Sequence, residues 1–388
     1  MKRILTGVLL SVILLAGCGR KPTVTTEGTF TTVITSDLHL SIDPNVNASV
    51  VRAMPYGSEV LQAIVNQVIA IHPDALILTG DNTNSGKPED CQALHDYLKQ
   101  VKDEGILVVM TTGNHDFGFS TPEEYEAQYF DLFEVKERDS ASLSYTSETD
   151  EVVMIAMDDN SATMGETGTF SEETMRWLNQ TLRDVSKEGK PILFLSHHNV
   201  TIGEPGESSR SYRITNTNLL GILKSYHVSL CLSGHLHGQQ ISTASGLPEI
   251  VSGMPLSTPH TLGILTIEDG ELDYHTEAID FAAYGRDGLA EAIKETDEAG
   301  AEAMRDVFLS LLEEEGIEQK DEVLELIEHF FQSYQEGSLG REAETIRTDS
   351  FYETMIQALY SHNYGPWMEH LMENPPEDAT ALHLELNN

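Results

Sequence analysis

The sequence has few cysteines and few tryptophans, and its one long apolar run lies at the very start of the chain. Three cysteines and two tryptophans occur in 388 residues. So few cysteines exclude a small disulfide-stapled scaffold. No period of roughly 20 to 50 residues recurs, so a repeat architecture is also excluded. With an apolar content of 40%, the chain is long enough for one large domain and an appendage.

Positive charge is scarce as well. The chain has 23 Lys and Arg residues against 63 Asp and Glu residues, and its formal net charge is -40. A surface this acidic repels the phosphate backbone of DNA and RNA, so no nucleic-acid polymer is expected as a partner. An anionic small substrate would need a local positive charge, and bound divalent cations are the natural source where basic side chains are rare. Nothing in the sequence indicates a protein partner.

The start of the chain predicts export. Met1-Lys2-Arg3 is a charged segment, and the apolar run Ile4 to Ala16 that follows is too short for a membrane span. Leu15-Ala16-Gly17-Cys18 has the lipobox pattern, which predicts a bacterial lipoprotein, secreted across the cytoplasmic membrane and lipid-anchored at Cys18. A simple signal anchor with an incidental cysteine is the alternative. Residues 19–28 would form a tether.

The two remaining cysteines are expected in the core. Cys91 falls on a predicted helix, and Cys231 falls inside a predicted buried strand. Both are therefore interpreted as small buried residues, with a disulfide as the alternative.

Strands and helices alternate in the first part of the chain. Phe30 to Thr35, Ala75 to Thr79 and Ile106 to Met110 are apolar runs typical of buried strands, and the segments between them contain helices that begin near Ser58 and Lys87. This alternation predicts a layered α/β fold with a mostly parallel central sheet.

The second part predicts another sheet. Residues 143–157 are expected to form a hairpin, and Ser171 is expected to cap a helix. After the apolar strands at 192–196 and 228–233, four short strands at 241–243, 250–252, 262–267 and 271–275 suggest antiparallel pairing. They should form a second sheet packed on the first, giving a two-sheet β-sandwich flanked by helices.

The character of the chain changes near residue 284. From Val323 to Tyr334 the apolar residues recur at helical spacing and form a wide stripe. The predicted organisation is a signal peptide and lipobox over 1–18, a tether over 19–28, a catalytic domain over 29–283 and a helical C-terminal domain over 284–388.

Five apolar runs end in polar residues of unusual composition. They are followed by Asp37-x-His39, Gly80-Asp81, Gly113-Asn114-His115-Asp116, His197-His198 and Gly234-His235-x-His237. Sites in open α/β sheets form at the carboxyl ends of strands, so these residues should meet at one edge. Carboxylate, imidazole and amide oxygen are ligands that suit Mn, Fe, Zn or similar ions, and a pair of such ions needs one shared ligand.

Together these motifs resemble those of the calcineurin-like metallophosphoesterase family, in the same order over residues 30 to about 280. The resemblance implies two divalent metal ions, with Asp81 bridging them. It further implies that Asp37, His39 and His237 complete one site, and that Asn114, His197 and His235 complete the other. Only one of the adjacent pair can point into the site. His197 is expected to ligate, with His198 as the alternative, and His198 would otherwise support the ligands or be structural.

The resemblance also implies a mechanism. A hydroxide bridging the two ions would attack phosphorus, because metal coordination lowers the pKa of water. His115 would stabilise the transition state or protonate the leaving group, and Asp116 would orient its imidazole.

Other polar residues are expected to be structural. We assign this role to His72, His95, His227 and His260. The segment Asn82 to Asn84 should be a turn that hydrogen-bonds its own backbone.

The substrate class is narrowed by departures from related motifs. Protein phosphatases of this superfamily carry GDxxDRG and GNHE, whereas this chain has Gly80-Asp81-Asn82-Thr83-Asn84-Ser85-Gly86 and GNHD. The arrangement is closest in style to bacterial class III cyclic nucleotide phosphodiesterases with a helical C-terminal domain, which implies a phosphodiesterase acting on cyclic nucleotides or similar small diesters. A phosphomonoesterase or a glycerophosphodiester hydrolase is the alternative, and a non-catalytic ligand-binding lipoprotein is a third.

Overall fold

The structure is a computed structural model that describes residues 24, 28–47, 53–161, 167–201, 213–360, 364–373, 375 and 378–386. The predicted signal peptide, the lipidation residue Cys18 and most of the predicted tether lie outside these residues. Across the described part of the chain, no helix combines the length and the apolar character needed to cross a bilayer.

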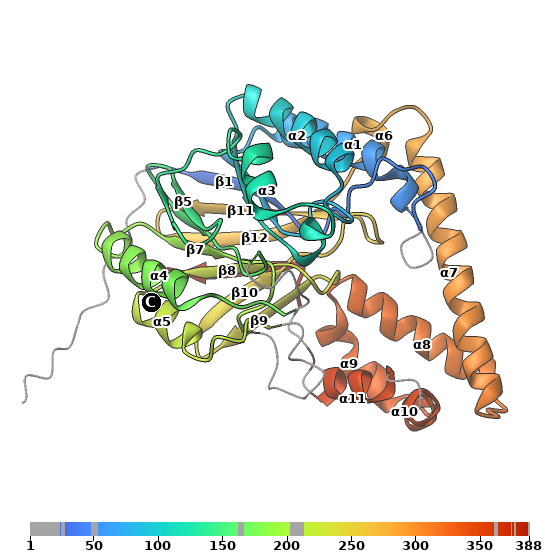
Figure 1. Ribbon diagram of the computed structural model, residues 1–388. Helices are drawn as coiled ribbons and strands as arrows, with labels where there is room; N and C mark the ends of the chain where they lie inside the picture. The colour runs from blue at the N-terminus through green and yellow to red at the C-terminus, as the bar shows by residue number, and fades with distance from the viewer. Residues whose placement is uncertain are drawn as a thin grey trace, which may run out of the picture.

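Two mixed β-sheets stack face to face (Figure 1). The first has the strand order β13-β12-β11-β1-β2-β3. Its strands are β1 (Phe30–Thr35), β2 (Ala75–Thr79), β3 (Leu107–Thr111), β11 (Thr261–Glu268), β12 (Glu271–Ala278) and β13 (Ala381–Glu385). Strands β1, β2 and β3 are parallel, while β11, β12 and β13 extend the sheet in antiparallel pairs.

The second sheet has the order β4-β5-β6-β7-β8-β10-β9. Its strands are β4 (Glu137–Arg138), β5 (Tyr145–Glu148), β6 (Val153–Ala156), β7 (Ile192–Leu195), β8 (Leu230–Ser233), β9 (Gln240–Ala244) and β10 (Leu247–Val251). Strands β6, β7, β8 and β10 are parallel, and the expected hairpin pairs β5 with β6. The predicted two-sheet architecture is confirmed.

The predicted membership of the second sheet was partly wrong. Strands β11 and β12 belong to the first sheet, because β11 pairs with β1 in antiparallel register, with Phe30 opposite Ile267. Alternating apolar residues indicate a strand and its buried face, but they do not select the neighbouring strand. The free edge of β1 is thereby covered by a segment more than 200 residues later in the chain.

Helices cover the outer faces of the sandwich. In Figure 1, α1 (Gly57–Ile71), α2 (Pro88–Asp103) and α3 (Pro122–Tyr129) lie over the first sheet, and α4 (Glu172–Val185) and α5 (Leu219–Ser225) lie over the second. Ser171 caps α4 as predicted, since its side chain accepts a hydrogen bond from the Thr174 amide. Helix α1 instead begins at Gly57 after the short 3₁₀ helix Met54–Tyr56, without a side-chain cap.

The predicted helical C-terminal region is present. It contains α6 (Phe281–Tyr284), α7 (Leu289–Glu314), α8 (Lys320–Gln335), α9 (Leu339–Thr348), α10 (Tyr352–Tyr360) and α11 (Tyr364–Glu373). The predicted stripe of α8 is buried in a separate apolar cluster that includes Phe308, Ile327 and Phe330. The chain then returns to the first sheet as β13 (Figure 1). The exact domain boundaries stay a prediction.

Both described cysteines are buried and unpaired. Cys91 lies on α2 and Cys231 on β8. They are core residues, in agreement with the first interpretation.

Candidate metal centre

The five polar strand ends meet at one end of the sandwich. Strands β1, β2 and β3 approach from the first sheet, and β7 and β8 approach from the second. The expectation of a single sheet edge was therefore incomplete, since the centre lies between the carboxyl ends of two sheets. Backbone hydrogen bonds join the loops: the Asp37 amide donates to the Gly80 carbonyl, and the His235 amide donates to the Asp37 carboxylate, both at 3.0 Å.

The first group of donors contains Asp37, His39, Asp81 and His237. One candidate ligand atom from each residue lies within 4.8 Å of the others. The two Nε2 atoms of His39 and His237 are 3.1 Å apart, and His39 Nε2 is 3.6 Å from Asp81 Oδ2. These residues are the predicted ligands of one metal ion.

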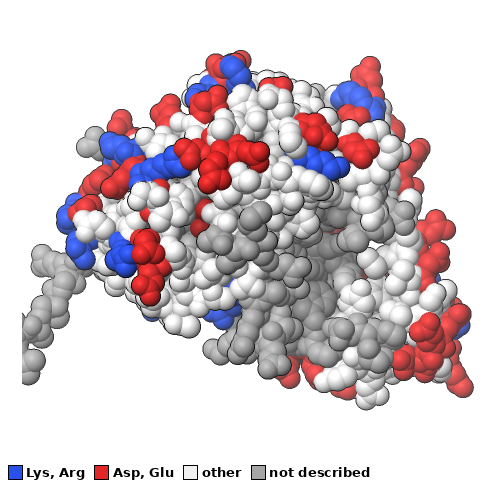
Figure 2. Space-filling model, in the orientation of Figure 1, with Lys and Arg blue, Asp and Glu red and all other residues white. Residues whose placement is uncertain are grey.

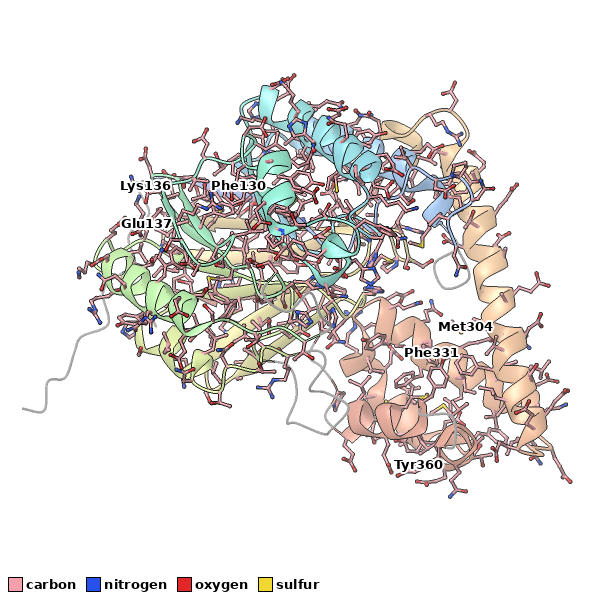
Figure 3. All side chains as sticks on the ribbon, viewed as in Figure 1. Phe130, Lys136, Glu137, Met304, Phe331 and Tyr360 are labelled. Atoms are coloured by element: carbon pink, nitrogen blue, oxygen red, sulfur yellow. The ribbon has the colours of Figure 1, made fainter. Side chains whose placement is uncertain are left out.

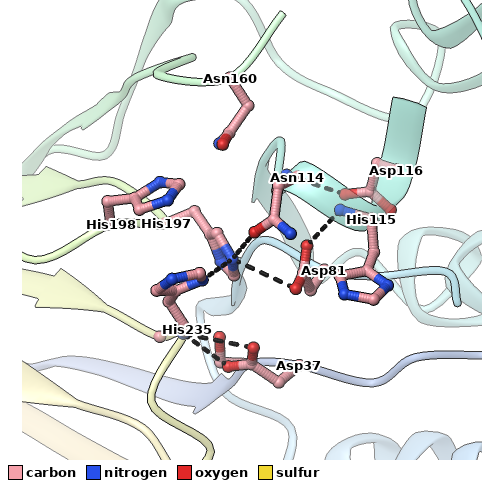
Figure 4. Close-up of polar contacts among 12 residues, drawn as sticks. Asp37, Asp81, Asn114, His115, Asp116, Asn160, His197, His198 and His235 are labelled. Carbon is pink, nitrogen blue, oxygen red and sulfur yellow. Dashed lines mark hydrogen bonds and ion pairs between the residues drawn. The ribbon is translucent and has the colours of Figure 1, made fainter. Parts of the chain in front are cut away.

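The second group contains Asp81, His197 and His235, with Asn114 beside them (Figure 4). His197 Nε2 lies 3.3 Å from Asp81 Oδ2 and 3.2 Å from both Asn114 Oδ1 and His235 Nδ1. Asp81 takes part in both groups, as a bridging ligand must. The structure thus brings all seven predicted ligand residues together, and their coordination of metal remains a prediction.

The backbone is strained at this centre. Asp37, His39, Asp81, His235 and His237 all have positive φ angles, between 40° and 70°. Only ten non-glycine residues of the described chain have this conformation. Such residues cost free energy and persist where the surrounding structure enforces them, which is common at functional sites. Half of this strain is concentrated on predicted ligands.

Glycine is required where the loops cross. A Cβ atom on Gly113 would collide with the backbone nitrogen of Asp81, and one on Gly234 would collide with the Ser36 hydroxyl and approach Asp37 Oδ2 to 2.5 Å. Only a residue without a side chain permits this approach. The two glycines allow the loops after β3 and β8 to place their ligands against Asp81 and Asp37.

The donor set fits a pair of cations. Asp37 and Asp81 are buried, and neither forms an ion pair with any lysine or arginine of the described chain. Burial raises the pKa of Asp37. Burial also works to raise the pKa of Asp81, but the adjacent His197 outweighs it and holds that pKa well below its usual range. Buried carboxylates that lack basic partners require another source of positive charge.

The pKa values of His39 and His235 agree with this interpretation, whereas that of His197 reflects its contact with Asp81. Burial lowers the pKa of His39 to about 3 and that of His235 to about 2, so both rings are neutral, as metal ligands must be. Burial also works to lower the pKa of His197, but Asp81 outweighs it and raises that pKa to about 10. His197 would have to lose this proton to bind metal, and the cation would then supply the positive charge beside Asp81.

His115 lies at the exposed side of the centre. Its amide donates a 2.8 Å hydrogen bond to Asp81 Oδ1, and its ring meets that of His39 edge to face at 4.5 Å. Its Nδ1 atom is 2.9 Å from the Asn84 carbonyl oxygen, which can only accept. Nδ1 therefore carries the hydrogen, and Nε2 is the nitrogen available for proton transfer.

The predicted role of Asp116 in orienting His115 was wrong. The Asp116 carboxylate accepts hydrogen bonds from the amides of Gly113 and Thr83 at 2.9 Å, from the Thr83 hydroxyl and from the Asn82 side chain at 3.0 Å. Asn82 and Thr83 are thus more than a self-contained turn. The buried carboxylate joins the loop that carries Asp81 to the loop that carries Asn114, and the Asn84 carbonyl orients His115.

The adjacent histidines are separated as expected. His197 faces Asp81 and Asn114, whereas the buried His198 ring lies 4.2 Å from the His235 ring (Figure 4). The His198 amide donates to Asp159 Oδ2 at 2.9 Å, and its Nδ1 is 3.5 Å from Asp159 Oδ1. His198 packs behind a ligand and does not reach the shared carboxylate.

Sequence reasoning missed a sixth polar strand end. Asp158, Asp159 and Asn160 follow β6 and are buried, and Figure 4 places Asn160 beside the centre. The signal was an acidic pair directly after the predicted strand 152–157.

Glu249 on β10 was also missed. Its buried carboxylate accepts hydrogen bonds from the amides of Val200 and Thr201 and from the Ser233 hydroxyl. It fixes the loop after His197 to the end of β8. A glutamate inside the apolar run 247–251 was the available signal.

The histidines expected to be structural lie apart from both donor groups. His72 ends α1 in a left-handed conformation, and His227 has positive φ near the start of β8. His95 lies 3.3 Å from Asp131 at the surface. His260 contacts the Pro255 carbonyl and Asp297 of α7.

Comparisons with known proteins give the same family over the sheets. The sequence pattern of the calcineurin-like phosphoesterase family matches residues 30–239, more than half of the chain. Among curated proteins, a probable glycerophosphodiester phosphodiesterase from Arcobacter nitrofigilis is 29% identical, with 46% of this chain and 64% of the relative aligned. The match therefore spans less than two thirds of that relative. A probable cyclic nucleotide phosphodiesterase from Moraxella catarrhalis is 26% identical over 58% of this chain and 77% of its own.

A solved structure shares the fold. A dimetal phosphatase from Danio rerio superposes with a TM-score of 0.53 at 16% identity, covering 64% of this chain and 96% of the other. The two donor groups, the shared Asp81 and the matched segment all lie in the same part of the molecule. The chain belongs to the calcineurin-like phosphoesterase family, and its donor groups are suited to the two-metal centre of that family.

Proposed function

We propose that this protein hydrolyses small phosphodiesters at the centre between its two sheets, with cyclic nucleotides as the leading substrate class. The observation that carries the proposal is the pair of donor groups that share Asp81, with His115 exposed beside them. A non-catalytic binding protein would not need a complete ligand set together with a proton-transfer group at its rim.

The donor groups suit two divalent cations, held as described above. Such ions would neutralise phosphoryl charge and lower the pKa of a bound water. The residues of the chain then have distinct tasks. Asp81 belongs to both donor groups and holds them in fixed relation. The His115 ring stabilises the departing oxygen, or delivers a proton from Nε2 when that nitrogen carries one, as the bond to phosphorus breaks.

The surface of the protein is acidic, so a phosphoester must be bound by the metal centre itself and not by the surrounding surface. In Figure 2, Asp and Glu side chains lie along the outer side of the helical part, and on this face they outnumber the basic side chains there. A polyanion would be repelled by this surface, while a small diester carries one charge and needs only the centre to bind. This argument supports a small substrate.

A glycerophosphodiester is the second candidate. It is favoured because one curated relative is named as a probable glycerophosphodiester phosphodiesterase, while another is named as a probable cyclic nucleotide phosphodiesterase. Both substrates are diesters, so they share the chemistry but differ in the leaving group. A phosphomonoesterase of the same fold is the third.

Substrate comparison on the metal-loaded protein tests the proposal. We expect faster turnover of bis-p-nitrophenyl phosphate than of p-nitrophenyl phosphate, and hydrolysis of 3′,5′-cyclic AMP. Preference for glycerophosphoethanolamine over cyclic AMP would select the second candidate. Turnover of the monoester alone would overturn the diesterase proposal.

We further propose that the protein is exported and lipid-anchored at Cys18. The support is the lipobox Leu15-Ala16-Gly17-Cys18 after a short apolar segment. Expression of the full chain in a bacterium with labelled palmitate should label the parent and leave Cys18→Ser unlabelled. Equal labelling of both proteins would contradict the proposal.

A further inference from the structure

The C-terminal end of α8 lies against the loop that carries the last metal ligand. Gly238 follows His237 directly, and a Cβ atom on Gly238 would lie 2.8 Å from Cε1 and 3.2 Å from the hydroxyl oxygen of Tyr334. The Tyr334 ring therefore occupies the space that a side chain at position 238 would fill. Tyr334 lies 97 positions after His237 in the sequence, but its ring contacts the residue next to this predicted ligand.

This contact is held in place by its surroundings. The Gln239 side chain donates to the Ala379 carbonyl and to the Tyr274 hydroxyl, and the Ala379 amide donates to the Gly337 carbonyl at 2.9 Å. A Cβ atom on Gly337 would lie 3.2 Å from the Gln239 carbonyl oxygen, so the turn after α8 is packed directly on the ligand loop. The C-terminal end of α8 is thus held against the ligand loop by these contacts, in addition to its connection to the rest of the chain through α7.

The centre is open at His237, and the Tyr334 ring contacts the next residue, Gly238. The side chains of Asp37, Asp81 and His197 are at most 2% exposed, whereas that of His237 is 41% exposed. The first donor group is therefore open on the side of His237, whose ring lies near that of His39, as does the ring of the exposed His115. Tyr334 is only partly buried and contacts the residue that directly follows His237.

We propose that Tyr334 determines substrate specificity by providing an aromatic surface for the organic group of the phosphoester. The proposal rests on the proposed function. A flat aromatic or heteroaromatic substituent would stack on the ring while the phosphorus lies at the metal centre. Stacking of a base on an aromatic side chain is favourable and tolerant of the identity of the base. The helical region thus contributes one wall of the substrate site, and Tyr334 selects aryl or nucleoside esters over alkyl esters.

Steady-state kinetics on the full metal-loaded chain test this role. The substrates are bis-p-nitrophenyl phosphate, which carries aromatic groups, and glycerophosphoethanolamine, which carries none. For Tyr334→Leu, we expect KM for the aryl ester to rise about tenfold with kcat unchanged, because the substrate loses one stacking contact. KM for the alkyl ester should stay at the parent value, and Tyr334→Phe should behave as the parent.

A matched control is available in the same region. Tyr360 on α10 is 55% exposed and lies at the far end of the helical part from the sheets (Figure 3). Tyr360→Leu makes the same chemical change away from the centre and should leave both KM values unchanged.

Should Tyr334→Leu fail to fold, Gly238→Ala tests the contact from the other side, because its methyl group displaces the ring. Gly221→Ala on α5, whose added methyl would meet nothing within 4 Å, is its control. The expected result is again a selective rise in KM for the aryl ester.

Two results would overturn the proposal: an unchanged KM for the aryl ester, or an equal loss on aryl and alkyl esters. The parent protein separately tests the proposed function. If it hydrolyses only monoesters, the diesterase proposal fails, and the same aryl-against-alkyl comparison with p-nitrophenyl phosphate and glycerol phosphate still decides the role of Tyr334.

Discussion

Replacing Asp116 with asparagine should weaken metal binding while leaving the pH dependence of kcat unchanged. Oδ1 accepts from the Thr83 amide and hydroxyl, and Oδ2 accepts from the Gly113 amide and from Asn82. An asparagine has one oxygen and one NH₂ group, so in either orientation at least two of these donors lose their acceptor. The loops that carry Asp81 and Asn114 would then be less firmly joined.

The magnitude follows from the position of the carboxylate behind the ligands. Loss of a group that orients ligands lowers metal affinity about 10- to 100-fold. Global stability is a less sensitive measure. Burial raises the pKa of Asp116 to about 6, so the ionised group already costs folding free energy at neutral pH, and its neutral replacement recovers part of this cost. We expect the free energy of unfolding to fall by at most about 2 kcal/mol.

The assay is titration of the metal-free protein with Mn²⁺, followed by a pH–rate profile at saturating metal. Asp139→Asn is the matched control. This buried carboxylate also accepts hydrogen bonds from a loop, donated by the Ala141 amide and the Ser142 hydroxyl, but it lies outside both donor groups. It should bind metal as the parent does. If Asp116→Asn bound metal normally but moved the pH dependence of kcat, Asp116 would be acting on His115 and the structural assignment would be refuted.

Two other substitutions separate catalysis from loop positioning. His115→Ala should retain metal and lose about 10²- to 10⁴-fold in kcat, because it removes only the proton-transfer group; parent-like turnover measured at equal metal content would contradict this role. Glu249→Gln should lower the free energy of unfolding by about 1 to 3 kcal/mol, since its buried carboxylate accepts from Val200, Thr201 and Ser233. Urea denaturation checks this value, and an unchanged midpoint would show that the loop after His197 does not depend on Glu249.

The sequence could indicate where the candidate ligands meet because each follows an apolar strand, and the resemblance to the family implied which of them would ligate. The carboxyl ends of parallel strands lie at the same edge of a sheet. Asp37, Asp81 and Asn114 could therefore be assigned to one edge without knowing the conformation of the loops. The helix around Phe330 could also be predicted, because the spacing of its apolar residues is a local property of the sequence.

The partners of individual side chains could not be predicted in the same way. The interpretation of Asp116 used its adjacency to His115, but its neighbours in space are Asn82 and Thr83 from another loop. Hydrogen-bond partners across loops depend on the positions of whole strands, which local patterns do not specify. The pairing of β11 with β1 and the contact of Tyr334 with Gly238 are long-range in the same sense.

The central claim is that Asp81 bridges two divalent ions held by both donor groups. Its most direct test is the metal content of purified parent protein and of Asp81→Ala after equilibration with Mn²⁺ and removal of free metal. We predict two ions per parent chain, and for Asp81→Ala the loss of bound metal together with phosphoesterase activity. Two ions retained by Asp81→Ala, or an active parent that binds none, would contradict the account.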